Sequence, residues 1–168
     1  MIIKTKDFQV DLIDEEDIDE IVEIYNSNRL FLISHMDKEA VTNKWLCEEL
    51  EDMKAIKFNS YKVFDIAAKK IIGFADFKIQ DEVYLSLFML HSDYKNKGLG
   101  TLIYNELEKY FISRKCRAIR IDVVTNYSTS VMDFWKRNGF KSYEEVELNW
   151  TGKVLPAVIM KKSLLESN

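Results

Sequence analysis

Cysteine and proline are scarce in this sequence, and no long apolar run occurs. The two cysteines, Cys47 and Cys116, give neither a disulfide framework nor a spacing of metal ligands, so no metal site is predicted. Nothing approaches the roughly 18 consecutive apolar residues of a membrane span, and Met1–Asp7 lacks the apolar core of a signal peptide. We therefore expect no membrane partner, and a reducing cytoplasm fits best.

Positive charge is also in deficit. The 24 Lys and Arg residues are outnumbered by 28 Asp and Glu residues, which leaves a net charge of −4. Domains that bind nucleic acid usually carry a basic excess, so no nucleic-acid partner is expected. The densest acidic stretch, residues 14–20, has two interpretations: it attracts a cationic amine, or it forms the first turn of a helix capped by Asp14.

Linker sequences are missing as well. The only proline is Pro156, and no stretch is rich in Pro, Gly and Ser. At 168 residues, with 47% hydrophobic and 31% charged residues, the chain has the composition of a globular protein and the length for a sizeable core. We therefore predict one domain over residues 1–168.

Hydrophobic periodicity predicts a mixed α/β chain. The expected strands cover residues 8–13, 61–67, 71–77, 83–90, 118–124, 141–148 and 154–161, and the expected helices follow caps at Asp14 and Asp37 and cover residues 102–114 and 131–137. The strand at 83–90 is nearly all apolar, so we expect it to be central and covered on both faces. Because one helix joins it to the strand at 118–124, the two are expected to be parallel.

The most informative stretch is Lys95–Thr101, which contains Gly98 and Gly100 between a predicted strand and a predicted helix. The first turn of a helix has unpaired N–H groups and the positive end of the helix dipole, and glycines let a phosphate approach that backbone. The spacing matches neither a Walker loop nor a three-glycine dinucleotide fingerprint, since Thr101 follows Gly100 and the third position is Ile103. The glycines alone are equally compatible with a plain strand-to-helix turn.

The surrounding residues resemble two markers of the GNAT superfamily of N-acetyltransferases. Phe88–Gly100 resembles the family's acetyl-CoA loop, with Lys95 at the usual Arg/Gln position and Ser92 at a common Pro position. Phe134–Phe140 resembles the second marker, Phe/Leu-Tyr-Glu-Lys-x-Gly-Phe. The resemblance covers about residues 61–162.

This resemblance implies a three-layer α+β fold with a central, mostly antiparallel sheet, two splayed parallel strands and flanking helices. It implies acetyl-CoA as co-substrate, with the backbone of Phe88, Met89 and Leu90 pairing with the pantetheine arm. The N–H groups of residues 96–101 are expected to hold the pyrophosphate, and the Leu90 N–H is expected to stabilise the oxyanion. The expected cofactor-binding residues are Phe88, Met89, Leu90, Lys95, Asn96, Lys97, Gly98, Leu99, Gly100, Thr101, Asn126, Ser128 and Trp135.

The catalytic side chains depart from the family pattern. Trp135 stands where many relatives have a Tyr that protonates the leaving thiolate, and an indole N–H cannot act as that acid. Trp135 is instead expected to pack against the cofactor arm or the core, and Tyr127 is the candidate proton donor, with solvent as the alternative. Asn126 and Ser128 both compete for a family Asn position. The candidates for a base that acts through water are Asp76, Asp81, Glu82 and His91.

Three functional hypotheses follow from these residues. The first is an N-acyltransferase that moves an acetyl group directly from acetyl-CoA to a primary amine of a small molecule or peptide. The second is a CoA-binding module that has lost catalysis, which the missing marker Tyr favours. The third is an acetyltransferase that modifies a protein partner. A homodimer is left open.

Overall fold

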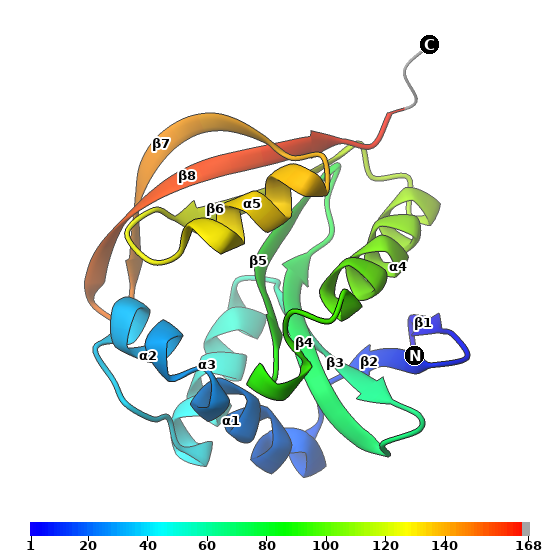
Figure 1. Ribbon diagram of the computed structural model, residues 1–168, viewed down its shortest axis with the longest axis vertical. Coiled ribbons are helices and arrows are strands. Elements are labelled where there is room, and N and C mark those ends of the chain that lie inside the picture. Colours follow the sequence, from blue (N-terminus) through cyan, green and yellow to red (C-terminus); the bar gives the residue numbers. More distant parts are fainter. Residues whose placement is uncertain (166–168) are drawn as a thin grey trace.

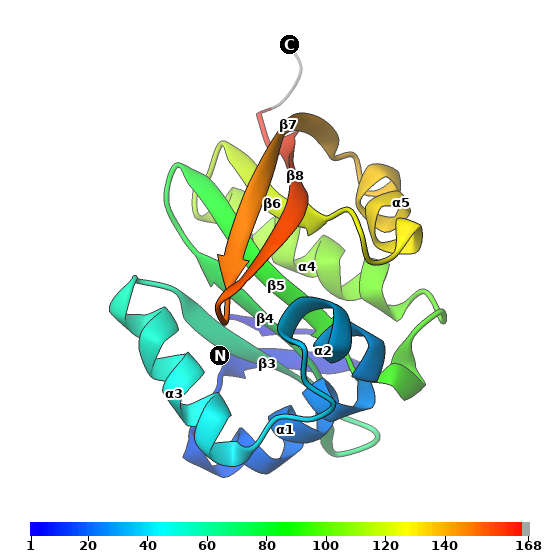
Figure 2. The same cartoon turned by 90° about the vertical axis from the view of Figure 1, so that its left-hand side faces the viewer.

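The computed structural model describes residues 1–165 and consists of one eight-stranded sheet with helices on both faces (Figures 1 and 2). The strands are arranged in the order β1-β2-β3-β4-β5-β6-β8-β7. They span Ile3–Lys4 (β1), Phe8–Leu12 (β2), Asn59–Asp65 (β3), Lys70–Lys78 (β4), Glu82–Leu90 (β5), Ala118–Val124 (β6), Lys141–Trp150 (β7) and Lys153–Ser163 (β8). The helices span Ile18–Ser27 (α1), Arg29–Met36 (α2), Asn43–Ala55 (α3), Leu99–Ser113 (α4) and Thr129–Arg137 (α5), with short 3₁₀ turns at Glu15–Asp17 and Ser92–Tyr94.

The sheet is antiparallel everywhere except between β5 and β6. These two strands pair only from Glu82–Ala118 to Tyr84–Arg120 and then separate. Just beyond the last pair, the β4–β5 register shifts so that Ser86 has no partner on β4. Such a bulge bends a strand and increases its twist, so it turns the rest of β5 away from β6. The predicted mostly antiparallel sheet with two splayed parallel strands is confirmed.

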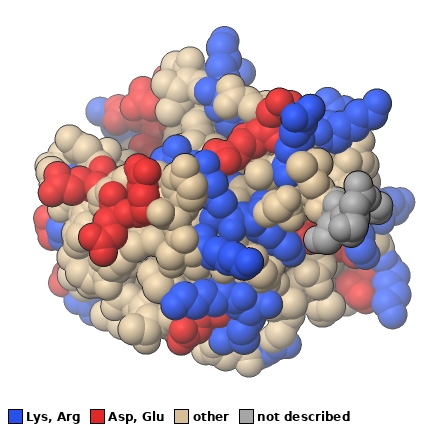
Figure 3. Space-filling model, turned by 90° about the horizontal axis from the view of Figure 1, so that it is seen from above, with Lys and Arg blue, Asp and Glu red and all other residues tan. Residues whose placement is uncertain are grey.

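The surface carries its charges unevenly. Figure 3 shows the face seen from above the view of Figure 1, where Lys and Arg side chains gather although the chain as a whole is acidic. Among residues 1–165, no helix is both long and apolar enough to cross a membrane.

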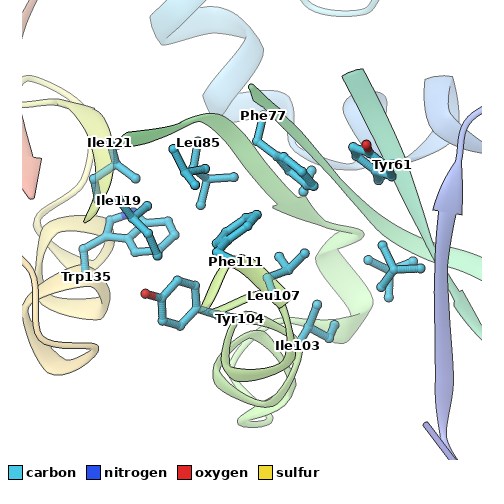
Figure 4. Packing of buried hydrophobic residues seen from close by; sticks show 14 of the residues in the cluster. Tyr61, Phe77, Leu85, Ile103, Tyr104, Leu107, Phe111, Ile119, Ile121 and Trp135 are labelled. Atoms are coloured by element: carbon cyan, nitrogen blue, oxygen red, sulfur yellow. The ribbon is translucent and has the colours of Figure 1, made fainter. Parts of the chain in front are cut away.

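Two hydrophobic clusters lie on opposite faces of the sheet. The larger one packs α4 and α5 against β4, β5 and β6, with Tyr104, Leu107 and Phe111 of α4 fully buried (Figure 4). The smaller one packs α1, α2 and α3 against β4 and the end of β5, around Tyr25, Leu32 and Phe74. Both clusters meet at β4, all of whose central residues are buried. The two layers of helices are therefore held apart by the sheet, and the gap between β5 and β6 connects their sides.

Some predicted boundaries are wrong. The helix expected from Asp37 begins at Asn43, where the Thr42 hydroxyl accepts a hydrogen bond from the Trp45 N–H at 3.1 Å. Asp37 instead ends α2 in a left-handed conformation, with φ of 53°. Neither α2 nor β1 was predicted. Strand β1 has only two residues, and α2 is short and directly follows the turn signals of residues 26–28.

The strand at 83–90 is central, as expected. The prediction that it is covered on both faces is wrong. Ser86 is exposed, and Leu87 and Phe88 are only partly covered. These three residues border a cavity rather than a second layer of core. A continuous apolar run cannot distinguish these two environments, because both are built from the same residue types.

Candidate active site

A single cavity of about 580 Å³ fills the gap between β5 and β6. Residues 84–90 of β5 line one side and residues 121–124 of β6 line the other. Two further walls close it on opposite faces of the sheet. The α4 wall consists of Gly98, Gly100 and Thr101 at the start of α4 together with Val131 and Phe134 of α5. The α3 wall consists of Glu49 and Met53 of α3 together with Phe31 and His35 of α2, Asp76 of β4 and Trp150 of β7.

The glycine turn delivers the start of α4 to the cavity. Asn96 and Gly98 have left-handed backbones, with φ of 58° and 75°, and α4 begins at Leu99. A Cβ on Gly98 would meet no atom of the protein within 4 Å, so its conformation rather than space requires glycine there. A Cβ on Gly100 would lie 3.4 Å from the Phe134 ring and would extend into the cavity. Unpaired N–H groups of the first helical turn therefore face the cavity at a point where the backbone is bare.

The end of β5 has backbone groups that point toward the gap. Along an antiparallel strand, residues bonded to one neighbour alternate with residues that point the other way. The His91 N–H donates to the Ile72 carbonyl on the β4 side at 2.8 Å, so the N–H groups of Leu90 and Phe88 point away from β4. The Asn28 amide fixes this end of the strand, because its Nδ2 donates to the Leu90 carbonyl at 3.0 Å and to the Ile24 carbonyl at 2.8 Å.

Most of the predicted cofactor-binding residues come together around this cavity. Those that line it are Phe88, Met89, Leu90, Lys95, Asn96, Gly98, Gly100, Thr101, Ser128 and Trp135, and the candidate acid Tyr127 lines it too. Lys97, Leu99 and Asn126 do not line it. Consecutive residues in a turn and in the first turn of a helix point in different directions, so only part of a continuous predicted stretch reaches the cavity surface.

Only one of the four candidate bases lines the cavity, and it is Asp76. Glu82 forms an ion pair with Lys161 at 2.9 Å, at the end where β5 and β6 are still paired. Asp81 lies in the turn before β5, and its carbonyl accepts from the Arg117 N–H at 2.7 Å. His91 follows β5, and its Nδ1 accepts from the Asp93 N–H at 3.2 Å. These three residues are outside the cavity because the β-hairpin and the turn before α4 carry them to its ends.

The α3 wall combines aromatic rings with carboxyl groups. His35 stacks on Phe31 with ring centres 4.0 Å apart, and Tyr127 and Trp150 pack around this pair. The Trp150 indole donates to Glu49 Oε1 at 3.0 Å, which ties the β7–β8 hairpin to α3. The tip of this hairpin lies beside α2 (Figure 2). Sequence reasoning missed Phe31, His35, Glu49 and Trp150, because none of them belongs to a recognisable motif.

Asp76 is the most perturbed acid in this wall. It is only 6% exposed, and its Oδ1 has no hydrogen-bond partner within the described residues. Burial raises the pKa of Asp76 to about 7, and the nearby charge of Glu49 acts in the same direction. Burial likewise raises the pKa of Glu49. Both carboxyl groups have therefore lost water that would stabilise their ionised forms, and an incoming cation would favour those ionised forms instead.

The sequence pattern of the Acetyltransferase (GNAT) family matches residues 19–140 of this chain. The chain belongs to the GNAT family. The predicted family is thereby confirmed, and the cavity lies within the matched residues together with the β7–β8 hairpin beyond them.

Known GNAT proteins share the fold at low sequence identity. A spermidine N-acetyltransferase from Vibrio cholerae, solved with CoA and spermine, is 16% identical with a TM-score of 0.71, covering 95% of this chain and 96% of that one. A ribosomal-protein-S5-alanine acetyltransferase from Vibrio fischeri is 20% identical with a TM-score of 0.69, covering 96% and 95%. In sequence, 51 residues are 41% identical to an uncharacterised N-acetyltransferase of Acanthamoeba polyphaga mimivirus. That match covers 29% of this chain and 12% of the mimivirus protein.

In this GNAT chain, the residue at the marker Tyr position belongs to the core. Trp135 is 7% exposed and packs against Phe134, Phe140 and Tyr104, with ring centres 4.9, 5.1 and 5.5 Å away. Figure 4 shows it beside Ile119 and Ile121 of β6. Its remaining exposed edge borders the cavity next to Phe88. Tyr127 instead lies on the opposite side, against Phe31 and His35, where burial raises the pKa of its hydroxyl.

Proposed function

We propose that this protein is an acetyl-CoA-dependent N-acetyltransferase that moves an acetyl group directly to a primary amine, as one catalytic domain. The observation that carries the proposal is the single cavity between β5 and β6, which opens to the start of α4 on one face of the sheet and to an acidic, aromatic wall on the other. Acetyl-CoA bound on one face of the sheet and an amine bound on the other face would meet in the gap between β5 and β6. The Vibrio cholerae spermidine N-acetyltransferase, which has the same fold and was solved with CoA and spermine, supports a site that takes a CoA donor and an amine acceptor.

On the donor side, the backbone carries most of the binding. The free N–H groups at the start of α4 suit a pyrophosphate, and bare glycine backbone lets it approach. Lys95 and Lys97 add positive charge at the turn, and Phe88 and Leu90 offer backbone groups that the pantetheine arm pairs with as an added strand. These roles depend on strand and helix geometry, so they tolerate the change from Arg/Gln to Lys95.

In the transfer step, the neutral amine nitrogen attacks the acetyl carbonyl carbon and the carbon–sulfur bond breaks. The Leu90 N–H points into the gap and suits the oxygen on which negative charge develops, a contribution worth about 3 kcal/mol when well aimed. The amine loses a proton to solvent, and the departing thiolate, whose thiol has a pKa of about 8.5, takes a proton from Tyr127 or from water. No residue of the protein forms a covalent intermediate.

The test is a thiol-release assay with acetyl-CoA and four acceptor panels: diamines, amino acids, aminoglycosides and peptides. We expect thiol release above the rate of hydrolysis with at least one panel, and saturable acetyl-CoA binding by calorimetry. Tight binding without release from any panel would instead favour a CoA-binding module, the alternative that Trp135 at the marker position supports. Release with folded protein partners but with no small amine or peptide would favour the protein-modifying alternative.

A further inference from the structure

Asp76 and Glu49 are two acidic side chains in the α3 wall that form no salt bridge in the described part of the chain, although the charge of Lys38 acts on Glu49 from outside the cavity lining. Within residues 1–165 neither takes part in a salt bridge, and Asp76 Oδ1 is buried without any hydrogen-bond partner. A buried carboxyl oxygen without a partner is costly, since it has exchanged water for nothing. Because Asp76 as a residue lines the cavity, a small reorientation of its carboxyl group lets a bound ligand supply the missing donor.

The charged residues around the cavity indicate the sign of the charge on that ligand. Asp122 also lines the cavity, but Arg120 and the Tyr84 hydroxyl already satisfy it, with Nε and Oη at 2.9 and 2.6 Å. The positively charged residues that line the cavity are Lys95 and Arg137, at the start of α4 and the end of α5, on the donor side. The α3 wall thus presents carboxyl groups and aromatic faces, which attract a cation, and among the described residues it places no Lys or Arg side chain at the cavity surface.

The location of Asp76 distinguishes a binding role from a role as base. Asp76 pairs with Leu87 across the β4–β5 ladder, three residues before Leu90. Three residues of a strand span about 10 Å, so the carboxyl group lies well away from the Leu90 N–H where the acetyl carbonyl is expected. That separation exceeds a direct hydrogen bond to the reacting nitrogen, but it suits a second group on the same acceptor.

We infer that Asp76 and Glu49 bind a distal cation of the acceptor, so that the preferred substrates are extended primary amines that carry a second positive charge and no carboxylate. This inference rests on the proposed acetyl transfer and names its substrate class. The Trp150, Phe31 and His35 rings enclose the same region and cover the apolar part of such a chain.

The first test compares three acceptors of equal length that differ only at the far end: 1,5-diaminopentane, pentylamine and 5-aminopentanoate. We expect kcat/KM to fall in that order, with at least about a tenfold advantage for the diamine over pentylamine. A kcat/KM for 5-aminopentanoate equal to or above that of the diamine would overturn the inference, while thiol release itself would still support the proposed function.

The second test removes each charge. In Asp76→Asn and Glu49→Gln, the diamine-to-pentylamine ratio of kcat/KM should fall toward one, mainly through KM for the diamine. Glu48→Gln is the matched control, because Glu48 is an exposed neighbour on α3 that faces Lys44 at 3.9 Å. Equal losses of kcat with all amines in Asp76→Asn would identify a base and overturn the distal-cation role.

A third measurement does not depend on turnover. Calorimetry of 1,5-diaminopentane with the CoA-loaded protein should show binding that Asp76→Asn weakens and Glu48→Gln does not. If no amine releases thiol but this binding pattern is found, the proposed function fails and the cation site stands. If the diamine does not bind, or binds Asp76→Asn equally well, the cation site is wrong.

Discussion

Gly98 lies inside the proposed CoA loop and Gly152 lies outside it, and both have the same kind of left-handed backbone. Substituting each of them therefore introduces similar backbone strain at the two places. Their φ angles are 75° and 79°, and a Cβ on either would meet no atom within 4 Å. A glutamate at either position therefore costs about 1–2 kcal/mol of conformational strain without a clash. We expect Gly98→Glu to abolish detectable acetyl-CoA binding by calorimetry and Gly152→Glu to preserve it. Unchanged affinity in a folded Gly98→Glu variant would contradict the assignment of this loop.

Trp135 is a packing residue rather than an acid. Its ring contacts three other aromatic rings, so Trp135→Ala should lower the free energy of unfolding by about 3–5 kcal/mol. Trp135→Phe keeps most of the packing, and we expect it to retain most of kcat in the thiol-release assay. A loss of about a thousandfold in kcat in Trp135→Phe, with acetyl-CoA affinity unchanged, would show a catalytic role that an indole should not have.

The carboxyl group of Asp76 should make stability depend on pH. Burial raises its pKa to about 7 in the folded protein, whereas an unfolded Asp ionises near about 3.9. Between these values the folded protein holds a proton that the unfolded chain has lost, so raising the pH favours unfolding. The contribution of this group to the loss is on the order of 4 kcal/mol when the pH rises past both values.

Urea unfolding at about pH 5 and about pH 8 measures this effect. We expect Asp76→Asn to lose less unfolding free energy than the unmodified protein when the pH rises from the lower to the higher value, because Asn has no proton to release. Asp81→Asn, in the exposed turn before β5, is the control and should leave the difference in place. An identical pH dependence in Asp76→Asn and the unmodified protein would disprove the raised pKa of the buried Asp76 carboxyl group.

At the scale of elements, Asn28 joins the α1–α2 corner to the end of β5. Its amide satisfies the carbonyls of Ile24 and Leu90 and so positions the Leu90 N–H in the gap. Asn28→Ala leaves both carbonyls without this donor, which should cost about 1–3 kcal/mol of unfolding free energy. Because the strand end then loses its anchor, kcat should fall while KM for acetyl-CoA changes little. A variant with the expected lower stability but unchanged kcat would show that Leu90 does not depend on this contact.

At the scale of the whole molecule, the division of donor and acceptor between two faces predicts direct transfer. Both substrates must then be bound together, so initial-rate lines at several fixed amine concentrations should intersect. The thiols are poor nucleophiles by position: Cys47 is exposed on α3 away from the cavity lining, and burial raises the pKa of Cys116. The Cys47→Ala, Cys116→Ala double variant should stay active. Parallel lines, or an acetyl group on Cys116 by intact-mass analysis without amine, would contradict the mechanism.

The net charge of the sequence predicted the total charge of the molecule but not where the charged residues lie on its surface. The sum of −4 is correct for the chain, yet Figure 3 shows a face on which Lys and Arg gather. A sum carries no positions, so neither this face nor the acidic α3 wall could be inferred from composition. The acidic stretch of residues 14–20 illustrates the same point, because Asp14 and Asp17 form a helix cap and an ion-pair network with Lys62 rather than part of the cavity.

The sequence alone determined the family, most of the strands and the loop at the start of α4. These features are local: a glycine with a left-handed backbone, an apolar run and the turn between them lie within a few residues of one another. The two markers near residues 88–100 and 134–140 carried the resemblance to the GNAT family, and it is this resemblance that implied the splayed sheet. The markers predict the path of the backbone rather than the roles of side chains. GNAT proteins that are only 16–20% identical to this chain share that backbone fold.

Only the tertiary structure decided which side chains face the acceptor. Glu49 on α3, Asp76 on β4 and Trp150 at the end of β7 are far apart in the sequence, and each occurs in a segment without a motif. They meet because the Ser86 bulge separates β5 from β6 and the β7–β8 hairpin reaches back to α2 and α3. The unpartnered oxygen of Asp76 exists only in that arrangement, since burial and the absence of a neighbour are properties of the packed molecule and of no single stretch of chain.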